Sequence, residues 1–208
     1  MYTPPAFRED DPLEMHAIMR AARLATLVTA TDAGLLATPL PFILDAAEGE
    51  SGVLYAHLAR ANAQWNTPVH GDALVTFTGP DAYVTPSWYA AKREHGKVVP
   101  TWNYEAVHAY GKVEFFEEPE RLLAVVTRLT RMHEAARPAP WAVSDAPEPY
   151  IAAQLRGIVG VRIAITRLEG KRKMSQNRSA EDRAGVAQGL AASEDATDRL
   201  VASLIPRS

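Results

Sequence analysis

Seven short segments rich in apolar and β-branched residues constrain the fold of this 208-residue chain more than any other feature. Most are joined by connections too short for a helix, such as Asp32-Ala33-Gly34 and Gly79-Pro80-Asp81, which favours antiparallel strands. Pro39 and Pro41 lack amide donors, so their strand must lie at a sheet edge or be broken there. The expected strands are 24–30, 35–44, 53–57, 73–78, 82–85, 107–116 and 158–168. We expect a mainly β fold, an antiparallel Greek-key β-barrel with flanking helices.

Helical signals surround these strands. Asp11 suits the N-cap of a first helix, Pro12 its first position, and Glu14 the reciprocal capping-box position. Further helices are expected at 60–65, at 119–136, and from Ser179 and Ser193 onward. The chain is therefore expected to be a single domain, residues 1–208, with an N-terminal helix and a C-terminal helical extension.

The composition limits the classes of function. The formal net charge is -3, whereas a dedicated DNA-binding domain usually carries a strong basic excess. The sequence has no cysteine, which excludes disulfides, thiolate catalysis and iron–sulfur clusters. It shows no signal peptide and no run approaching the roughly 20 apolar residues that cross a bilayer. We expect a cytoplasmic protein with no membrane partner.

The first candidate site is the segment 55–62, where an expected strand leads into an expected short helix. A helix N-terminus exposes unpaired amides and the positive end of the dipole, so phosphate binds well there. Arg60 lies at the junction and adds a guanidinium. The alternative, an ordinary turn with a solvated arginine, is favoured by this stretch alone. His57 is more typical of a strand histidine with satisfied hydrogen bonds than of a metal ligand.

The second candidate consists of two aromatic motifs in one region expected to be irregular, Thr85-Pro86-Ser87-Trp88-Tyr89 and Pro100-Thr101-Trp102-Asn103-Tyr104. Aromatic faces that stack on a planar ring, together with amides that bond its polar edge, form a good site for a ring system. The alternative is that these residues anchor a long loop. The motifs themselves favour neither interpretation.

The third candidate is the segment 169–178, which is expected to form a loop after the last strand. Lys171-Arg172-Lys173 and the following Ser175-Gln176-Asn177 supply cations and hydrogen-bond donors for a cofactor phosphate, a nucleotide or a DNA backbone. The alternative is a solvated loop balanced by Glu169, Glu181 and Asp182. A short run of charge, taken alone, favours that alternative.

Several motifs occur together in a fixed order. They are M-Y-T-P-P-A-F at 1–7, Y-A-H-L-A-R-A-N at 55–62 with Gln64-Trp65, Y-V-T-P-S-W-Y at 83–89, V-P-T-W-N-Y at 99–104 with V-H-A-Y-G at 107–111, and L-E-G-K at 168–171 with M-S-Q-N-R at 174–178. Together they resemble the PaiB-like proteins, a family described as FMN-binding negative transcriptional regulators. The resemblance runs from residue 1 to about residue 190.

The family belongs with the FMN-binding split barrels, which include the pyridoxamine-phosphate oxidases. The resemblance implies a homodimer with FMN at the subunit interface. It implies that the flavin phosphate lies near Arg60 and Asn62, and that the ring passes the backbone of Thr38 and Leu40. The cofactor-binding residues expected from the resemblance and the three candidate segments are Thr38, Leu40, His57, Arg60, Asn62, Trp102, Asn103, Tyr104, Lys173 and Gln176.

The sequence departs from the oxidases in two respects. Ala61 follows Arg60, so their adjacent basic pair at the phosphate is not matched, and their C-terminal arginines for the substrate phosphate are not recognisable. The resemblance therefore does not extend to vitamin B6 oxidation.

Two functions remain open at this stage. The first is a flavin-binding negative transcriptional regulator, and the alternative is an FMN-dependent oxidoreductase that acts on a small substrate. The sequence contains no helix-turn-helix with a basic recognition helix. Direct DNA binding therefore has little support from the residues, and its only candidate is the Lys171-Arg172-Lys173 segment.

Overall fold

The computed structural model describes residues 1–206 and falls into two compact units. Unit 1 contains residues 1–19, 78–107 and the described part of 169–208, and unit 2 contains residues 20–77 and 108–168. Two long strands, β6 (Ala73–Val84) and β7 (Thr101–Gly111), contribute residues to both units. The single-domain organisation stays a prediction.

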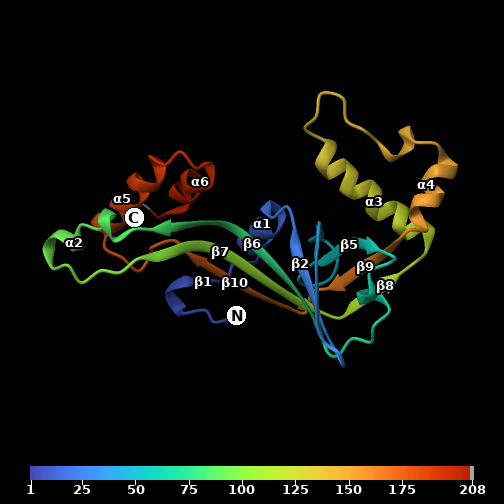
Figure 1. Ribbon diagram of the computed structural model, residues 1–208, viewed down its shortest axis with the longest axis horizontal. Coiled ribbons are helices and arrows are strands. Elements are labelled where there is room, and N and C mark those ends of the chain that lie inside the picture. The colour runs from blue at the N-terminus through green and yellow to red at the C-terminus, as the bar shows by residue number, and fades with distance from the viewer. Residues whose placement is uncertain (207–208) are drawn as a thin grey trace. The chain divides into compact units, whose positions relative to one another are not determined.

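The strands form two sheets (Figure 1). The six-stranded sheet has the order β1 (Arg8–Glu9), β10 (Arg167–Lys173), β7, β6, β2 (Ala25–Thr31) and β3 (Gly34–Leu40). The four-stranded sheet has the order β4 (Ile43–Asp45), β5 (Val53–Ala59), β9 (Ile158–Ala164) and β8 (Val113–Phe116). The pairings of β1 with β10, β2 with β3 and β6, β5 with β4 and β9, and β8 with β9 are antiparallel. The mainly β, antiparallel fold is confirmed, and within residues 1–206 the strands form two sheets rather than one closed barrel.

The prolines act on their strand as expected. The strand β3 contains Pro39 and ends at Leu40, immediately before Pro41, and β4 begins at Ile43. In the described sheet, β3 is the terminal strand, and no other strand pairs with its second edge. The strand expected over 35–44 is thus both broken and at an edge, because the missing amide donors cannot join a ladder on both sides.

Several expected boundaries were wrong. The strand expected over 107–116 is divided into β7, which begins at Thr101 in the region expected to be irregular, and β8. The strand expected over 158–168 is divided between β9 and the start of β10. The chain does not turn at Gly79-Pro80-Asp81, because β6 runs through this tripeptide. The buried positions change from Ala73, Val75 and Phe77 to Ala82 and Val84. The alternation of buried and exposed side chains therefore shifts by one residue where the strand passes Pro80. The segment expected as a charged loop after residue 168 is largely the strand β10.

In unit 1 the helices are α1 (Pro12–Ala21), α2 (Ala91–Glu94), α5 (Ala180–Ala191) and α6 (Ala196–Leu204), of which α1 extends by two residues into unit 2. Asp11 Oδ1 accepts a hydrogen bond from the Leu13 amide over 2.8 Å and caps α1, as expected. The Asp11 amide donates to Glu9 and not to Glu14. The helices α5 and α6 pack together, and their Val186, Leu190 and Val201 side chains share a buried cluster with Met174.

In unit 2 the helices are α3 (Pro119–Glu134) and α4 (Glu148–Leu155), with 3-10 turns η2 (Ala63–Trp65) and η4 (Val143–Asp145). The buried face of α3 presents Leu122, Val125 and Leu129 to β5 and β9. None of the helices within residues 1–206 combines the length and apolarity needed to span a bilayer.

Candidate functional site

Two of the expected site residues meet in unit 2. Asn62 Nδ2 donates to Thr38 Oγ1 over 2.9 Å, and Thr38 Oγ1 donates to Gln64 Oε1 over 2.5 Å. Gln64 is 1% exposed, and its Nε2 reaches Thr29 Oγ1 at 3.0 Å and the Leu36 carbonyl at 3.3 Å. This polar network therefore joins β3 to the end of β5. The sequence singled out Thr38 and Asn62 but not Gln64 as a site residue.

The turn after β5 differs from the expected helix. It is the single 3-10 turn η2, and Asn62 is its N-cap, with Oδ1 accepting from the Gln64 amide over 2.9 Å. An amide that was expected to face a phosphate is thus occupied by the Asn62 side chain. The helix-dipole argument for a phosphate at this turn loses its basis, because three residues provide neither a row of free amides nor a sizeable dipole.

Arg60 is partly exposed and has several protein partners. Its Nε donates to the Arg156 carbonyl over 2.7 Å, and its guanidinium forms an ion pair with Glu117. The ring of Trp65 lies 5.7 Å from the guanidinium carbon. A ligand phosphate would exchange with Glu117 to reach this arginine, so Arg60 as a phosphate ligand stays a prediction.

His57 differs from the satisfied strand histidine expected from the sequence. It lies on β5 opposite Gly160, and its Nδ1 is buried without a hydrogen-bond partner among the described residues. Burial lowers the pKa of His57, so its neutral form is favoured. The strands β3 and β5 lie in contact, and Leu40 is buried at the end of β3. Side chains alternate along a strand, so His57 lies on the same face of β5 as Tyr55, which packs against the α3 cluster. The unpaired nitrogen of His57 therefore lies on the α3 side of β5 and is not a contact with β3.

The second and third candidate segments meet in unit 1. Lys173 Nζ donates to the Trp102 carbonyl over 2.6 Å and to Thr101 Oγ1. Lys171 is 8% exposed, donates to the Tyr2 carbonyl, and lies 5.1 Å from the ring centre of Tyr104. No carboxylate pairs with either lysine among residues 1–206. Burial, together with the neighbouring Lys171 and Arg178, lowers the pKa of Lys173.

Arg172, between these lysines, belongs to a separate ionic cluster. Its guanidinium lies 2.6 Å from Glu105, 3.0 Å from Glu14 and 3.7 Å from Glu9. Glu105 is 5% exposed, so most of its charge is balanced inside the protein by Arg172. The three consecutive cations therefore do not form one exposed basic surface.

Asn103 and Gln176 are bonded within the protein. Asn103 Nδ2 donates to Ser175 Oγ over 3.0 Å, and both side chains are buried. Gln176 accepts from the Met174 amide over 2.6 Å and donates to the Arg172 carbonyl over 2.5 Å. Their amide groups hold the turn at Ser175, whose φ of 61° lies in the left-handed region.

The two aromatic motifs take different roles. Trp88 anchors its loop to α5, where an added Cβ at Gly185 would lie 2.1 Å from the Trp88 carbonyl oxygen. Trp102 is half exposed, and with Tyr104 it lines a hollow of about 340 Å³. The anchoring alternative thus describes Trp88, while Trp102 and Tyr104 remain at the surface.

A family model described as "Putative FMN-binding domain" matches residues 1–167. The chain belongs to this family. It is 32% identical over 206 residues to the protease synthase and sporulation protein PAI 2 of Bacillus subtilis, across 99% of this chain and 96% of that protein. The expected membership of the PaiB-like proteins is confirmed.

Two further relatives extend the comparison. The chain is 36% identical over 227 residues to an uncharacterized protein of Aspergillus fumigatus, across 88% of this chain and 84% of the relative. The structure of the flavocytochrome Anf3 from Azotobacter vinelandii matches with a TM-score of 0.57 at 16% identity, across 80% of this chain and 69% of that chain. At this identity the structural likeness establishes the fold alone.

Proposed function

We propose that this chain binds FMN beside β3 and the end of β5. The observation that carries the proposal is the hydrogen bond between Asn62 and Thr38, which brings two of the expected flavin-binding residues together at β3 and the turn after β5. Both residues lie within the stretch 1–167 that matches a family model described as "Putative FMN-binding domain". A flavin ring offers hydrogen-bonding atoms at its polar edge, and the site offers neutral side chains and a free strand edge to bond them.

The residues present fit such a ligand. The free edge of β3 offers backbone groups near Thr38 and Leu40 for the polar edge of the ring, because no other described strand pairs there. Asn62 and Arg60 would hold the phosphate end, with Glu117 released from its ion pair. When bound, FMN supplies a redox-active ring. The backbone of Thr38 and Leu40 would orient that ring.

The proposed assembly is a homodimer with FMN at the subunit interface. Two features of unit 2 support it. The strand β3 has an unpaired edge, and Leu35 on this strand is 74% exposed. An exposed strand edge can pair with another chain, and two-fold dimers are the commonest homo-oligomers.

The proposed role is negative regulation of transcription, which is the role that the resemblance to the PaiB-like proteins implies. Direct DNA contact through Lys171-Arg172-Lys173 has little physical support. Lys171 is buried, and Arg172 pairs with three carboxylates. We therefore place the regulatory step in a flavin-dependent property of the protein rather than in this segment.

The test is a fluorescence titration of the purified protein with FMN and with riboflavin, followed by addition of NADH and NADPH. Saturable FMN binding near one flavin per chain is expected. Absence of saturable flavin binding would refute the proposal. Sustained oxidation of either nicotinamide in the presence of a small electron acceptor would instead support the FMN-dependent oxidoreductase.

A further inference from the structure

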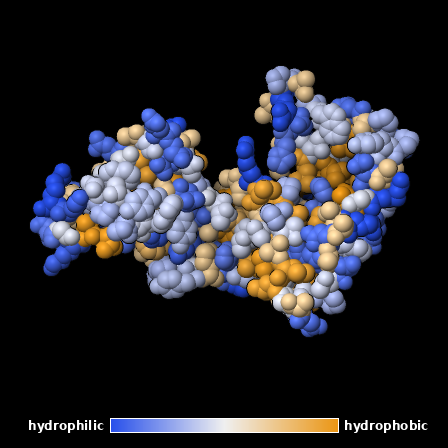
Figure 2. Space-filling model, in the orientation of Figure 1, coloured by the Kyte–Doolittle hydropathy of each residue, from blue (hydrophilic) through white to orange (hydrophobic). Residues whose placement is uncertain are grey.

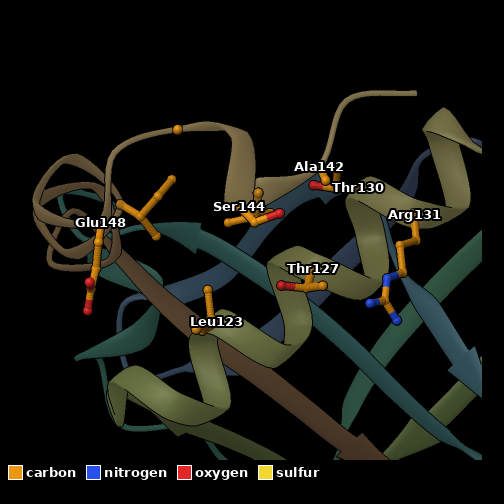
Figure 3. Close-up of a pocket in the computed structure, with 10 residues that line it drawn as sticks. Leu123, Thr127, Thr130, Arg131, Ala142, Ser144 and Glu148 are labelled. Atoms are coloured by element: carbon orange, nitrogen blue, oxygen red, sulfur yellow. The ribbon is translucent and has the colours of Figure 1, made fainter. Parts of the chain in front are cut away.

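A cavity of about 550 Å³ lies in unit 2 between α3 and the segment 142–151 (Figure 3). Its lining residues are Leu123, Thr127, Thr130, Arg131, Ala142, Val143, Ser144, Ala146, Glu148 and Ile151. Its volume is within the range of about 300–1,000 Å³ that is typical of small-molecule sites. Figure 2 shows hydrophobic residues at the surface in the region of α3 and the loop after it, bordered by hydrophilic ones. None of the residues proposed for FMN lines this cavity.

One stripe of α3 forms the floor of the cavity. Leu123, Thr127, Thr130 and Arg131 follow the spacing i, i+4, i+7 and i+8, which places them on one side of a helix. The helix already buries a different stripe, which contains Leu122, Val125 and Leu129. The lining stripe is therefore not needed to attach α3 to the sheet.

The opposite wall is held in place by hydrogen bonds. The Trp141 amide donates to Glu134 over 3.1 Å, and the Ala142 amide donates to Asp145 over 2.8 Å. Val143 is buried. Ile151 on α4 packs against the buried cluster of α3. The cavity is thus formed before any ligand arrives, so a ligand would not have to order the loop.

Several polar groups of the lining have unused hydrogen-bonding capacity. The side chains of Thr127, Thr130, Arg131 and Ser144 form no side-chain hydrogen bond or ion pair within residues 1–206. Glu134, the acid nearest to Arg131 in sequence, is occupied by Arg137 and the Trp141 amide. In Figure 3, Arg131 lies at one end of the cavity and Glu148 at the other.

We propose that this cavity binds a small amphipathic carboxylate, with its carboxylate on Arg131 and its apolar part between Leu123, Val143 and Ile151. The planar guanidinium matches a carboxylate geometrically, and Thr130 adds a hydroxyl donor nearby. A cation in the last turn of α3 is also favoured by the helix dipole. The helix dipole alone would explain a cation at Arg131. It does not explain why this cation borders an open apolar cavity that also contains the unpaired hydroxyl groups of Thr127, Thr130 and Ser144.

The test is isothermal titration calorimetry of the full chain with octanoate, octanol and octylamine. Octanoate is expected to bind most tightly. Arg131→Ala should weaken octanoate binding about 10- to 100-fold, as expected for the loss of one charged hydrogen-bond partner, and leave octanol binding unchanged. The matched control is Arg128→Ala on the same helix, since Arg128 pairs with Asp45 and does not line the cavity. This control should bind octanoate like the wild type.

Two further variants test separately the volume of the cavity and the charge at its end. Thr127→Leu should weaken octanoate and octanol alike, because the larger side chain fills the apolar part of the cavity. Arg131→Glu should reverse the preference, so that octylamine binds more tightly than octanoate. The proposal is overturned if octanoate shows no saturable binding up to its solubility limit, or if Arg131→Ala and Arg128→Ala bind it equally well.

Discussion

Asn62 donates a hydrogen bond to Thr38 over 2.9 Å, across 24 positions of the sequence. The bond joins strand β3 to the turn that follows β5, and Gln64 extends it to Thr29 on β2. Three stretches of chain are thus tied together by neutral side chains that are largely withdrawn from water. In a low-dielectric interior, such a network holds its side chains in one arrangement only when each polar group has a hydrogen-bond partner.

The Gln64→Leu variant should lower the free energy of unfolding by about 2–3 kcal/mol, because it removes the hydrogen bonds that a buried amide makes to several partners. The groups affected are Thr29 Oγ1, Thr38 Oγ1 and the Leu36 carbonyl. Urea denaturation measures the change. Gln154→Leu is the matched control, since Gln154 is an exposed glutamine of the same unit, and its loss should be near zero. Equal effects of the two substitutions would contradict the role given to the network.

The sequence predicts the strands of this fold well where burial alternates regularly. Residues 159, 161, 163 and 165 are buried as expected, and α1 and α3 begin at the predicted prolines. Residues 169–173, most of the strand β10, were missed because their charges gave no alternating pattern. Their strand is stabilised by partners distant in sequence, namely Glu9 and Glu105 for Arg172 and Tyr104 for Lys171. The pattern of residues within the strand itself does not reveal such partners.

The candidate site was predictable only in part, for a related reason. The proximity of Thr38 and Asn62 was implied by the family resemblance, whereas Gln64 has no charge or motif that marks it as the centre of a network. Arg60 was read as available to a ligand, because the sequence does not reveal that Glu117 reaches it. Pairings between distant side chains depend on tertiary packing, which periodicity and capping rules do not describe.

The Arg60–Glu117 ion pair predicts opposite effects of two substitutions on FMN affinity. Arg60→Ala should weaken FMN binding about 10- to 100-fold, because a charged hydrogen bond to phosphate contributes about 1.5–3 kcal/mol. Glu117→Gln should strengthen FMN binding, since the arginine no longer has a competing carboxylate. Fluorescence titration of each variant measures both effects.

Riboflavin is the control ligand for this pair of variants, because it lacks the phosphate. Its affinity should change little in either variant. Equal losses for FMN and riboflavin in Arg60→Ala would mean that the residue acts through the fold. No loss for FMN would move the phosphate away from Arg60, and Lys171→Gln and Lys173→Gln would then be the next variants to titrate.

The Arg172→Ala variant should destabilise the protein by about 3–5 kcal/mol, because it leaves the buried carboxylate of Glu105 without a counter-charge. The double variant Arg172→Met with Glu105→Gln should recover much of this loss, since it removes both charges. Thermal unfolding measures the two variants. A double variant as unstable as Arg172→Ala would show that the ion pair is not the source of the effect.

The burial of His57 predicts a pH dependence of stability. Burial lowers the pKa of His57 below its ordinary value of about 6.5, so below that pH the unfolded chain binds a proton that the folded chain does not. The free energy of unfolding should therefore fall as the pH falls below about 6.5, and it should fall less steeply in His57→Gln. Urea midpoints at neutral and mildly acidic pH test this. His133→Gln, at an exposed site on α3, should keep the wild-type slope.

The free edge of β3 predicts the effect of a charge on assembly. Leu35 on β3 is 74% exposed. Leu13 on α1 is 75% exposed, so it serves as a control leucine of similar exposure. If the proposed homodimer covers the edge of β3, Leu35→Arg should weaken it strongly, because an arginine pressed into an apolar interface loses its hydration without gaining a partner. Leu13→Arg should leave the dimer intact. Sedimentation velocity over a concentration series measures both variants, with circular dichroism as a check that each remains folded. A folded Leu35→Arg variant that dimerises like the wild type would place the interface on another surface, and a wild type that is monomeric at micromolar concentration with FMN bound would refute the dimer itself.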